Sequence, residues 1–272
     1  MEQSQQADHL SDWVILPIRA LKDNYIWALL NKKKQELWVV DPGDAEPVLS
    51  FLSQNTYRLT GILLTHHHWD HTNGVERLLA FQSDITVVGA ANSIVSQITH
   101  RVKEGDEVIC SSLPLRVLEI PGHTLDHIAF YTNTFVFTGD TLFSAGCGRV
   151  FEGTFAQMHQ SLNKLAALPD DIKVYCGHEY TLQNLAFAAH VEKNNEFIQE
   201  KIARVKQLIA ADGSSLPSTL GEEKKMNPFL RCTRVDVVSA VAAYAKKTLV
   251  HSDDVFEYLR RWKDEAGSSL FY

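Results

Sequence analysis

The run His66-His67-His68-Trp69-Asp70-His71 directly follows the short apolar segment 61–65. A segment of this length and composition is typical of a buried strand, so the run leaves the strand's C-terminal end. Alternate side chains of an extended stretch face the same way, so His66 and His68 should point together, whereas Asp70 and His71 lie on the following turn. Imidazole and carboxylate groups in this pattern suit zinc, iron or manganese, and they predict a metal site.

Three further candidate ligands stand at the ends of other predicted strands. His123, Asp140 and His178 each come directly after, or within a few residues of, a short apolar run. Side chains at strand ends converge on one rim of a sheet, which is where α/β proteins build their sites. A single loop cannot supply all the ligands of two metal ions, so these three residues are needed to complete the site.

Together the two groups supply enough ligands for two ions that share one carboxylate. We expect one ion on His66, His68 and His123, the other on Asp70, His71 and His178, and Asp140 as the bridge. Two cations about 3.5–4 Å apart stabilise a bridging hydroxide, which is a nucleophile at neutral pH. No catalytic residue beyond the metal ligands is therefore expected.

Composition sets the broad class of the protein. The chain has 272 residues, 45% of them hydrophobic, and a net charge of −7, which is ordinary for a soluble globular protein and argues against nucleic-acid binding. The four cysteines (Cys110, Cys147, Cys176 and Cys232) form no C-x-x-C pair and fit a reducing compartment. The polar N-terminal residues show no secretory signal, and no apolar stretch approaches the ~20 residues of a membrane span. We expect a cytoplasmic monomer.

Two regions follow a short lead-in, residues 1–11, which we expect to be flexible. Residues 12–179 alternate short strands with helices predicted at 45–54, 75–81, 92–100 and 155–168, which implies layered α/β architecture with helices outside the sheets. Residues 180–272 are helical instead, with helical periodicity over 181–211 and 235–263 and a loop around 213–217. We place the boundary between a catalytic and a smaller helical domain at 179–180.

Several motifs resemble those of one family. They are T-H-H-H-W-D-H (65–71), P-G-H-T (121–124), T-G-D-T-L-F-S-A-G-C-G-R (138–149), F-E-G-T (151–154) and C-G-H-E-Y-T (176–181). They resemble the glyoxalase II family, the hydroxyacylglutathione hydrolases of the metallo-β-lactamase superfamily. The first motif alone indicates only the superfamily, whereas the segments around Asp140 and His178 narrow it to the family.

The resemblance implies an αββα metallo-β-lactamase sandwich followed by a small helical domain. It implies two divalent metal ions per chain, zinc first, with iron or manganese as alternatives. The implied reaction is hydrolysis of S-(2-hydroxyacyl)glutathione thioesters, chiefly S-D-lactoylglutathione to glutathione and D-lactate, the second glyoxalase step of methylglyoxal detoxification. A thioester expels a thiolate whose pKa is about 8.5, so its departure needs little help from a general acid.

The resemblance also implies a glutathione site made of Arg149, Tyr180, Arg260 and Lys263. The spacing of Arg260 and Lys263 places both on one face of a helix, and arginine can bind a carboxylate through two hydrogen bonds. Some family members have tyrosine where Phe151 stands. Since phenylalanine lacks that hydroxyl, any contact there must be apolar or through the backbone, and we do not assign Phe151 to the glutathione site. We interpret Cys147 as structural.

Other functions remain as alternatives. The nearest is a mononuclear-iron persulfide dioxygenase of the same superfamily, which needs only two histidines and one aspartate. A non-catalytic metal-binding module would bind metal without turnover. A β-lactamase is disfavoured because those enzymes commonly place cysteine where Asp140 stands. Nucleic-acid processing conflicts with the acidic balance of the chain.

Overall fold

A computed structural model describes residues 12–211 and 213–267, so the predicted flexible lead-in at 1–11 lies outside the described residues. The chain divides into two compact units. The first comprises the chain up to residue 119 together with 126–132, and the second comprises 120–125 together with the chain from 133 onwards. The domain boundary predicted at 179–180 stays a prediction.

The first unit is built on a six-stranded mixed sheet. Its strands, in spatial order, are β1 (Trp13–Ala20), β2 (Asn24–Asn31), β3 (Glu36–Val40), β4 (Arg58–Leu63), β5 (Thr86–Ala90) and β6 (His100–Val102). β1, β2 and β3 pair antiparallel, whereas β3 to β6 are parallel. Every residue of β2 is buried, as expected for a central strand covered on both faces.

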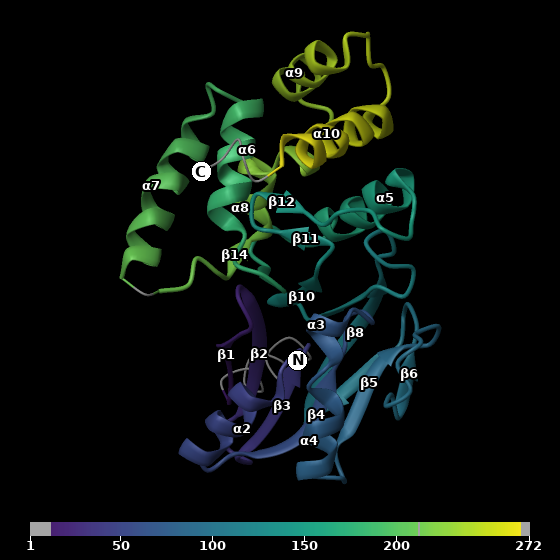
Figure 1. Cartoon of the computed structure of the whole chain (residues 1–272), viewed down its shortest axis with the longest axis vertical. Helices are drawn as coiled ribbons and strands as arrows, with labels where there is room; N and C mark the ends of the chain where they lie inside the picture. Colours follow the sequence, from purple (N-terminus) through teal and green to yellow (C-terminus); the bar gives the residue numbers. More distant parts are fainter. Residues whose placement is uncertain (1–11, 212, 268–272) are drawn as a thin grey trace, which may run out of the picture. The chain divides into compact units, whose positions relative to one another are not determined.

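Helices α2 (Ala45–Gln54) and α4 (Val75–Phe81) contact each other beside this sheet (Figure 1). They bury Val48 and Leu78 in a core shared with Ile62 and Val87 of the parallel strands. The one-turn helix α3 (Trp69–Thr72) lies in the loop after β4. The parallel part of the sheet thus directs the C-terminal ends of β3, β4 and β5 towards the loops that carry the histidine run.

The first unit also contains an antiparallel meander. It consists of β7 (Glu107–Cys110), β8 (Leu113–Glu119) and β9 (Ile128–Tyr131). Buried and exposed residues alternate along β7, as they do in a strand with one covered face.

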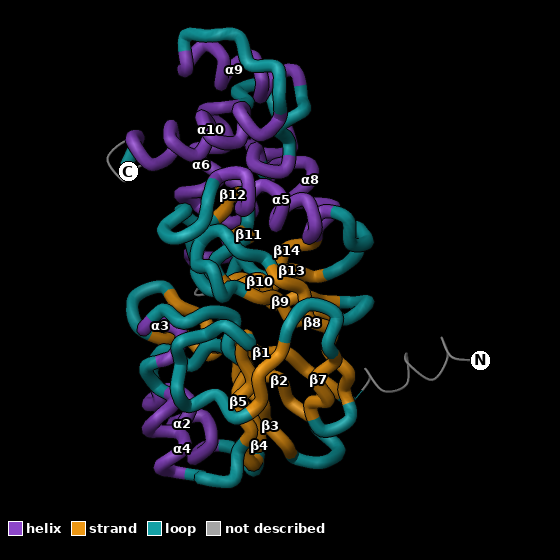
Figure 2. The backbone as a smooth tube through the Cα atoms, turned by 90° about the vertical axis from the view of Figure 1, so that its right-hand side faces the viewer, coloured by secondary structure: helices purple, strands orange, loops and turns teal. Residues whose placement is uncertain are grey.

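The second unit carries most of the helices, coloured purple in Figure 2. Its strands are β10 (Phe135–Gly139), β13 (Lys173–Cys176) and β14 (Ser218–Thr219), with the small hairpin of β11 (Leu142–Phe143) and β12 (Gly146–Cys147). Its helices are α5 (Phe155–Ala166), α6 (Thr181–Val191), α7 (Glu196–Ala210), α8 (Leu220–Met226), the 3₁₀ turn η1 (Pro228–Leu230), α9 (Val235–Ala245) and α10 (Ser252–Ala266). A second hydrophobic core joins α6, α7 and α8 through Leu185, Ile198 and Met226.

The helix predicted at 92–100 does not form. The side chain of Arg101 explains why, since its guanidinium donates hydrogen bonds to the carbonyls of Ser93 at 2.9 Å, Ala91 at 3.2 Å and Val95 at 3.3 Å. A side chain from the next strand thus satisfies carbonyls that a helix would pair with its own amides.

The two long helical stretches are each broken in two. Residues 181–211 form α6 and α7 with a break at 192–195, and residues 235–263 form α9 and most of α10 with a break at 246–251. Lys246 ends α9 in the left-handed conformation, with φ of 53°, which stops a helix by redirecting the chain. Helical periodicity predicted these helices but not the breaks between them.

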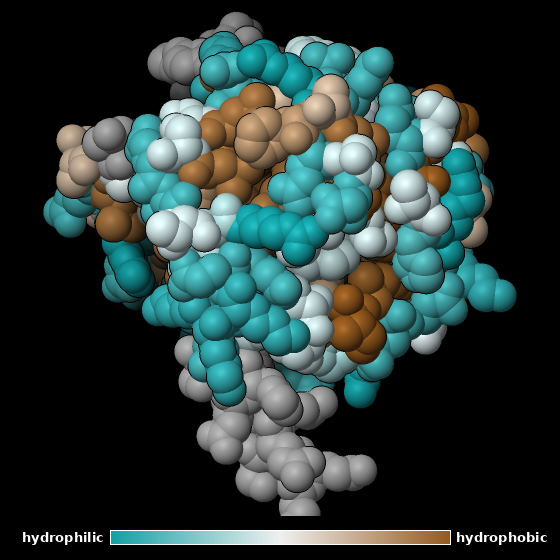
Figure 3. Space-filling view, turned by 90° about the horizontal axis from the view of Figure 1, so that it is seen from below, coloured by the Kyte–Doolittle hydropathy of each residue, from teal (hydrophilic) through white to brown (hydrophobic). Residues whose placement is uncertain are grey.

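No described helix is long and apolar enough to cross a membrane. On the face drawn in Figure 3, hydrophobic side chains form areas interrupted by hydrophilic ones. The four cysteines all lie among the described residues, and each is a buried, reduced thiol.

Candidate metal centre

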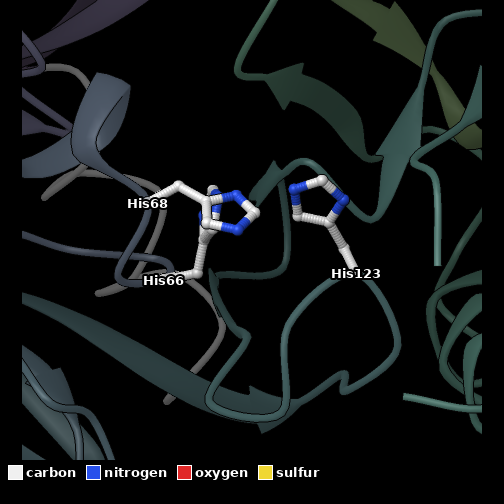
Figure 4. Close-up of side chains that lie close together, drawn as sticks. All are labelled: His66, His68 and His123. Atoms are coloured by element: carbon white, nitrogen blue, oxygen red, sulfur yellow. The ribbon is translucent and has the colours of Figure 1, made fainter. Parts of the chain in front are cut away.

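The histidine run forms a compact group in the first unit. The rings of His66 and His68 lie 4.8 Å apart, and those of His66 and His71 lie 4.2 Å apart. Figure 4 shows His66 and His68 leaving the loop after β4 with their rings close together. The α3 turn brings His71 back to the group, because its amide donates to the carbonyl of His68 at 3.0 Å. The pairing of His66 with His68 agrees with their expected common orientation.

Asp41, at the end of β3, organises this group. One of its carboxylate oxygens lies 3.0 Å from Nδ1 of His71 and accepts from the hydroxyl of Thr65 at 2.6 Å. The same hydroxyl lies 3.0 Å from Nδ1 of His66, and the other Asp41 oxygen accepts from the amide of Thr65 at 2.7 Å. Engaging Nδ1 in this way leaves Nε2 of each histidine as the nitrogen that could bind a metal ion.

Sequence analysis missed Asp41. The available signal was the Asp41-Pro42-Gly43 turn after an apolar strand, because a polar residue at the C-terminal end of a parallel strand faces the site. Asp41 is 4% exposed and adopts φ of 54°, a conformation that costs a non-glycine residue about 1–2 kcal/mol. The ligand atoms of Asp41, His66 and His71 all lie within 4.8 Å of one another.

Asp70 is held from two directions. Nδ2 of Asn24, on β2, donates to both the side chain and the carbonyl of Asp70, each at 3.1 Å. The carboxylate lies 3.6 Å from Nε2 of His71, so the two predicted ligands of one ion are neighbours. Gly43 passes so close that an added Cβ would lie 1.7 Å from the carbonyl oxygen of Asp70, which excludes any other residue at this position.

The two residues of the run that we do not assign as metal ligands, His67 and Trp69, differ in their surroundings. Trp69 is 67% exposed. His67 instead pairs with Asp126 through a contact of 2.8 Å between Nδ1 and a carboxylate oxygen. The next residue, His127, stacks on His66 with centroids 4.6 Å apart. Asp126 and His127 therefore support the run, and nothing in their own sequence context marked them.

Asp140 lies between two histidines in the second unit. One carboxylate oxygen is 3.5 Å from Nε2 of His123 and 3.3 Å from Nε2 of His178. All three side chains are buried. A buried carboxylate oxygen close to two imidazole nitrogens is the donor arrangement of a shared metal ligand, so these residues fit the predicted group.

Main-chain groups fix the orientation of these second-unit ligands. His123, drawn in Figure 4, leaves the loop after β8, and its Nδ1 lies 2.8 Å from the carbonyl oxygen of Arg149. Gly148 is packed so tightly that an added Cβ would lie 1.9 Å from the carbonyl oxygen of Asp140. The ring of His178 stacks on Tyr180, with centroids 4.6 Å apart and planes inclined by 6°. The residues predicted from three strand ends are thus locked by their neighbours.

The two basic residues predicted on the last helix lie over one aromatic ring. Arg260 and Lys263 place their charged groups 5.1 Å and 5.7 Å from the ring centre of Phe229. Lys263 also donates to Oδ1 of Asn184. Burial, and then the charge of Arg260, lower the pKa of Lys263 to about 7. This ammonium group therefore titrates near neutral pH.

Arg260 is buried and largely engaged. It donates to the carbonyl of Cys147 at 2.8 Å and to the carboxylate of Asp264 at 2.8 Å. None of the residues that the structure describes accepts a hydrogen bond from its Nε. Arg149 is more exposed and lies 3.5 Å from Asp264, so this carboxylate, which sequence analysis missed, serves both arginines.

Two further side chains, Phe151 and Cys147, lie near these groups. Phe151 is 62% exposed and meets the ring of His123 edge-on at 5.2 Å. Burial raises the pKa of the Cys147 thiol, although Arg260 and Lys263 lower it in part. A protonated thiol is a poor nucleophile, which fits a structural interpretation.

Comparisons with known families cover nearly the whole chain. Residues 25–178 match the family described as the metallo-beta-lactamase superfamily, and residues 179–266 match the hydroxyacylglutathione hydrolase C-terminus. The chain is 46% identical to a protein of Idiomarina loihiensis named hydroxyacylglutathione hydrolase, over 92% of this chain and 98% of the relative. A protein of the same name from Photobacterium profundum is 47% identical, over 91% and 97% of the two chains.

Solved structures share the fold. The crystal structure of ETHE1 from Myxococcus xanthus is 26% identical with a TM-score of 0.64, covering 93% of this chain and 91% of its own. The BLEG-1 B3 metallo-beta-lactamase is 21% identical with a TM-score of 0.62, covering 80% and 99%. They confirm the predicted fold class, α/β sheets of metallo-β-lactamase type followed by a helical region.

Proposed function

Since this chain belongs to the hydroxyacylglutathione hydrolase family of the metallo-β-lactamase superfamily, we propose that it hydrolyses S-(2-hydroxyacyl)glutathione thioesters, chiefly S-D-lactoylglutathione to glutathione and D-lactate. Within the structure, one observation carries the chemistry. Asp140 sets one carboxylate oxygen within 3.5 Å of Nε2 of both His123 and His178, the arrangement of a bridging metal ligand.

The His and Asp clusters of this fold bind divalent metal. We propose two ions per chain, zinc first with iron or manganese as alternatives, shared among seven ligands. His66, His68 and His123 would hold one ion, Asp70, His71 and His178 would hold the other, and Asp140 would serve both. Ions bound there would supply a hydroxide nucleophile at neutral pH and electrostatic stabilisation of negative charge on the attacked carbonyl.

The chain's own residues orient these ligands. Asp41 acts on His71 directly and on His66 through Thr65. The carbonyl of Arg149 fixes His123. Such partners hold each imidazole in one tautomer and in one orientation before metal arrives. A general acid is not required, because the glutathione thiolate is a good leaving group.

We propose that glutathione binds to Arg149, Tyr180, Arg260 and Lys263. Three of the four residues are cations gathered around Asp264 and Phe229, which suits a substrate with a carboxylate at each end. The Nε of Arg260 supplies a donor that no described residue uses. Tyr180, stacked on His178, places a hydroxyl-bearing ring beside a proposed metal ligand.

The assignment of tasks follows the sequence. We propose that residues 12–179 carry the metal chemistry and that 180–272 contribute to substrate binding, with Arg149 as the exception. We also propose that the protein works as a cytoplasmic monomer. The buried, reduced state of all four cysteines supports a reducing compartment.

One experiment tests the proposal: metal analysis of the purified protein together with a thioesterase assay. We expect two metal ions per chain and loss of the ultraviolet thioester absorbance of S-D-lactoylglutathione without oxygen. Oxygen-dependent formation of sulfite from glutathione persulfide would favour the dioxygenase instead. Metal-replete protein that leaves all glutathione thioesters intact would establish a non-catalytic metal-binding module.

A further inference from the structure

The turn of the hairpin formed by β11 and β12, residues 143–146, is buried and contains a residue in a strained backbone conformation. Its residue Ala145 is fully buried and adopts φ of 56°, the left-handed conformation that favours glycine. The turn also buries main-chain amide and carbonyl groups, each of which needs a hydrogen-bond partner. Residues outside the hairpin must therefore supply hydrogen bonds to this turn.

Two side chains at and just beyond α8 supply these partners. The carboxylate of Glu223 accepts from the amide of Ala145 at 2.8 Å. Nδ2 of Asn227 donates to the carbonyls of Gly146 at 2.9 Å and Phe143 at 3.2 Å, and it also contacts the Glu223 carboxylate at 3.2 Å. Both side chains are fully buried. One carboxyl group and one side-chain amide thus hold the turn in place by hydrogen bonds. We call this pair, Glu223 and Asn227, the clamp.

The hairpin leads directly to the proposed glutathione cations. The carbonyl of Cys147, in β12, accepts from Arg260 at 2.8 Å. Asn184, on α6, donates to the carbonyl of Ser144 in the turn at 2.9 Å and also bonds Lys263 through its oxygen. Any shift of this turn therefore moves the partners of both cations.

We propose that Glu223 and Asn227 are positioning residues for glutathione: they fix the turn at 143–146 and thereby the places of Arg260 and Lys263. This inference rests on the proposed glutathione site. Among the described residues, the hydrogen bonds of Glu223 and Asn227 reach the hairpin and not Arg260 or Lys263, so their effect passes through the hairpin.

The chemistry of the clamp indicates a conservative replacement. Burial raises the pKa of Glu223 to about 7, partly offset by hydrogen bonds from Ser218 and the amide of Ala145. Glutamine resembles the neutral carboxyl group, keeps an oxygen for the amide and has the same length. Aspartate keeps the charge but is shorter by one methylene group, so it withdraws the carboxylate from the turn.

The test compares four variants: Glu223→Ala, Glu223→Asp, Glu223→Gln and Glu222→Ala. Glu222 is the matched control, because it lies on the same helix and pairs with Lys201 at 3.0 Å and with the cap residue Thr219 rather than with the hairpin. KM and kcat for S-D-lactoylglutathione, metal content, the unfolding midpoint and the Kd of glutathione by calorimetry are measured for each.

We expect alanine and aspartate at position 223 to raise KM and the Kd of glutathione about 10-fold, a fraction of the ~100-fold cost of a 1 Å misplacement, while kcat and metal content stay. Glutamine at position 223 should keep KM and the Kd of glutathione near their wild-type values. Glu222→Ala should lower the unfolding midpoint without changing KM or Kd. If the alanine variant fails to fold, the aspartate variant tests the inference.

The inference is overturned if KM and Kd stay unchanged in the aspartate variant, or if Glu222→Ala raises them equally. Failure of the proposed function gives a different result, namely a wild-type protein that turns over no glutathione thioester. The Kd of glutathione then still decides whether Glu223 positions a glutathione site, and wild-type protein that binds no glutathione refutes the inference.

Discussion

The two sets of proposed metal ligands are held by different means. In the first unit one side chain, Asp41, reaches His71 directly and His66 through Thr65. In the second unit the carbonyl of Arg149 contacts Nδ1 of His123, whereas His178 stacks on the ring of Tyr180. Two ligands of the first set thus depend on a single side chain, whereas the ligands of the second set depend on separate neighbours, one of them in the main chain.

Loss of Asp140 should have the largest effect and tests the second set. Asp140→Ala removes a ligand that we assign to both ions, so metal content should fall to near zero. The rate should fall by more than the about 10²–10³-fold that loss of one oxyanion donor costs. Elemental analysis and the thioesterase assay measure this, with Asp170→Ala, an exposed change in the same unit, as the control. Retention of two metals per chain would refute the bridging role.

Replacement of Asp41 tests the first set. Asp41→Ala leaves Nδ1 of His71 and the Thr65 hydroxyl without their shared acceptor, so metal affinity should fall by about 10–100-fold, the usual cost of removing a residue behind a metal ligand. Titration with a chelator measures this loss. Asp44→Asn nearby keeps the cap of α2 and should have no effect. Unchanged affinity in Asp41→Ala would show that the first set does not depend on Asp41.

Replacing the cations of the proposed glutathione site should affect substrate binding without affecting either set of proposed metal ligands. Arg260→Ala combined with Lys263→Ala removes two charged donors, each worth about 1.5–3 kcal/mol, so KM should rise at least about 10-fold while metal content stays. Steady-state kinetics and metal analysis measure both, and Arg261→Ala, an exposed arginine of the same helix paired with Glu257, is the control. An unchanged KM would place glutathione elsewhere.

The smallest expected effect is a pH dependence. The pKa of Lys263 is lowered to about 7, so its ammonium group is present below pH 7 and is lost as the pH rises through that value. A neutral amine attracts a carboxylate less, so KM should rise above pH 7 by up to about 10-fold. Lys263→Arg keeps its charge throughout and should flatten the profile. A wild-type KM that stays constant between pH 6 and about 9 contradicts this assignment.

The proposed ligands could be predicted from the sequence because metal chemistry restricts residue types. The histidine run and the residues after three strands were visible as letters and spacing, and the resemblance supplied the cations of the last helix. The residues that orient these ligands could not be predicted from the sequence. Asp41 can orient the ligands only because its positive φ directs its side chain towards Thr65 and His71, both more than twenty positions away in the sequence.

The same limit explains the errors in the fold. Residues 92–100 had helical periodicity, but Arg101, from a neighbouring strand, took the carbonyls that a helix needs. Glu223 has the ordinary appearance of a surface residue on a charged helix, and only tertiary packing shows that it is buried against Ala145. Such pairings depend on which segments meet in space, which a local pattern does not specify.

The close crossing at Gly43 bears on protein engineering. An added Cβ there would lie 1.7 Å from the carbonyl oxygen of Asp70, so the end of β3 and the histidine loop interlock as one part. Grafting the loop alone onto another scaffold would lose Asp41, Gly43 and the orientation that they impose. The smallest transplantable module is therefore the pair of adjacent strands β3 and β4 with both of their C-terminal loops.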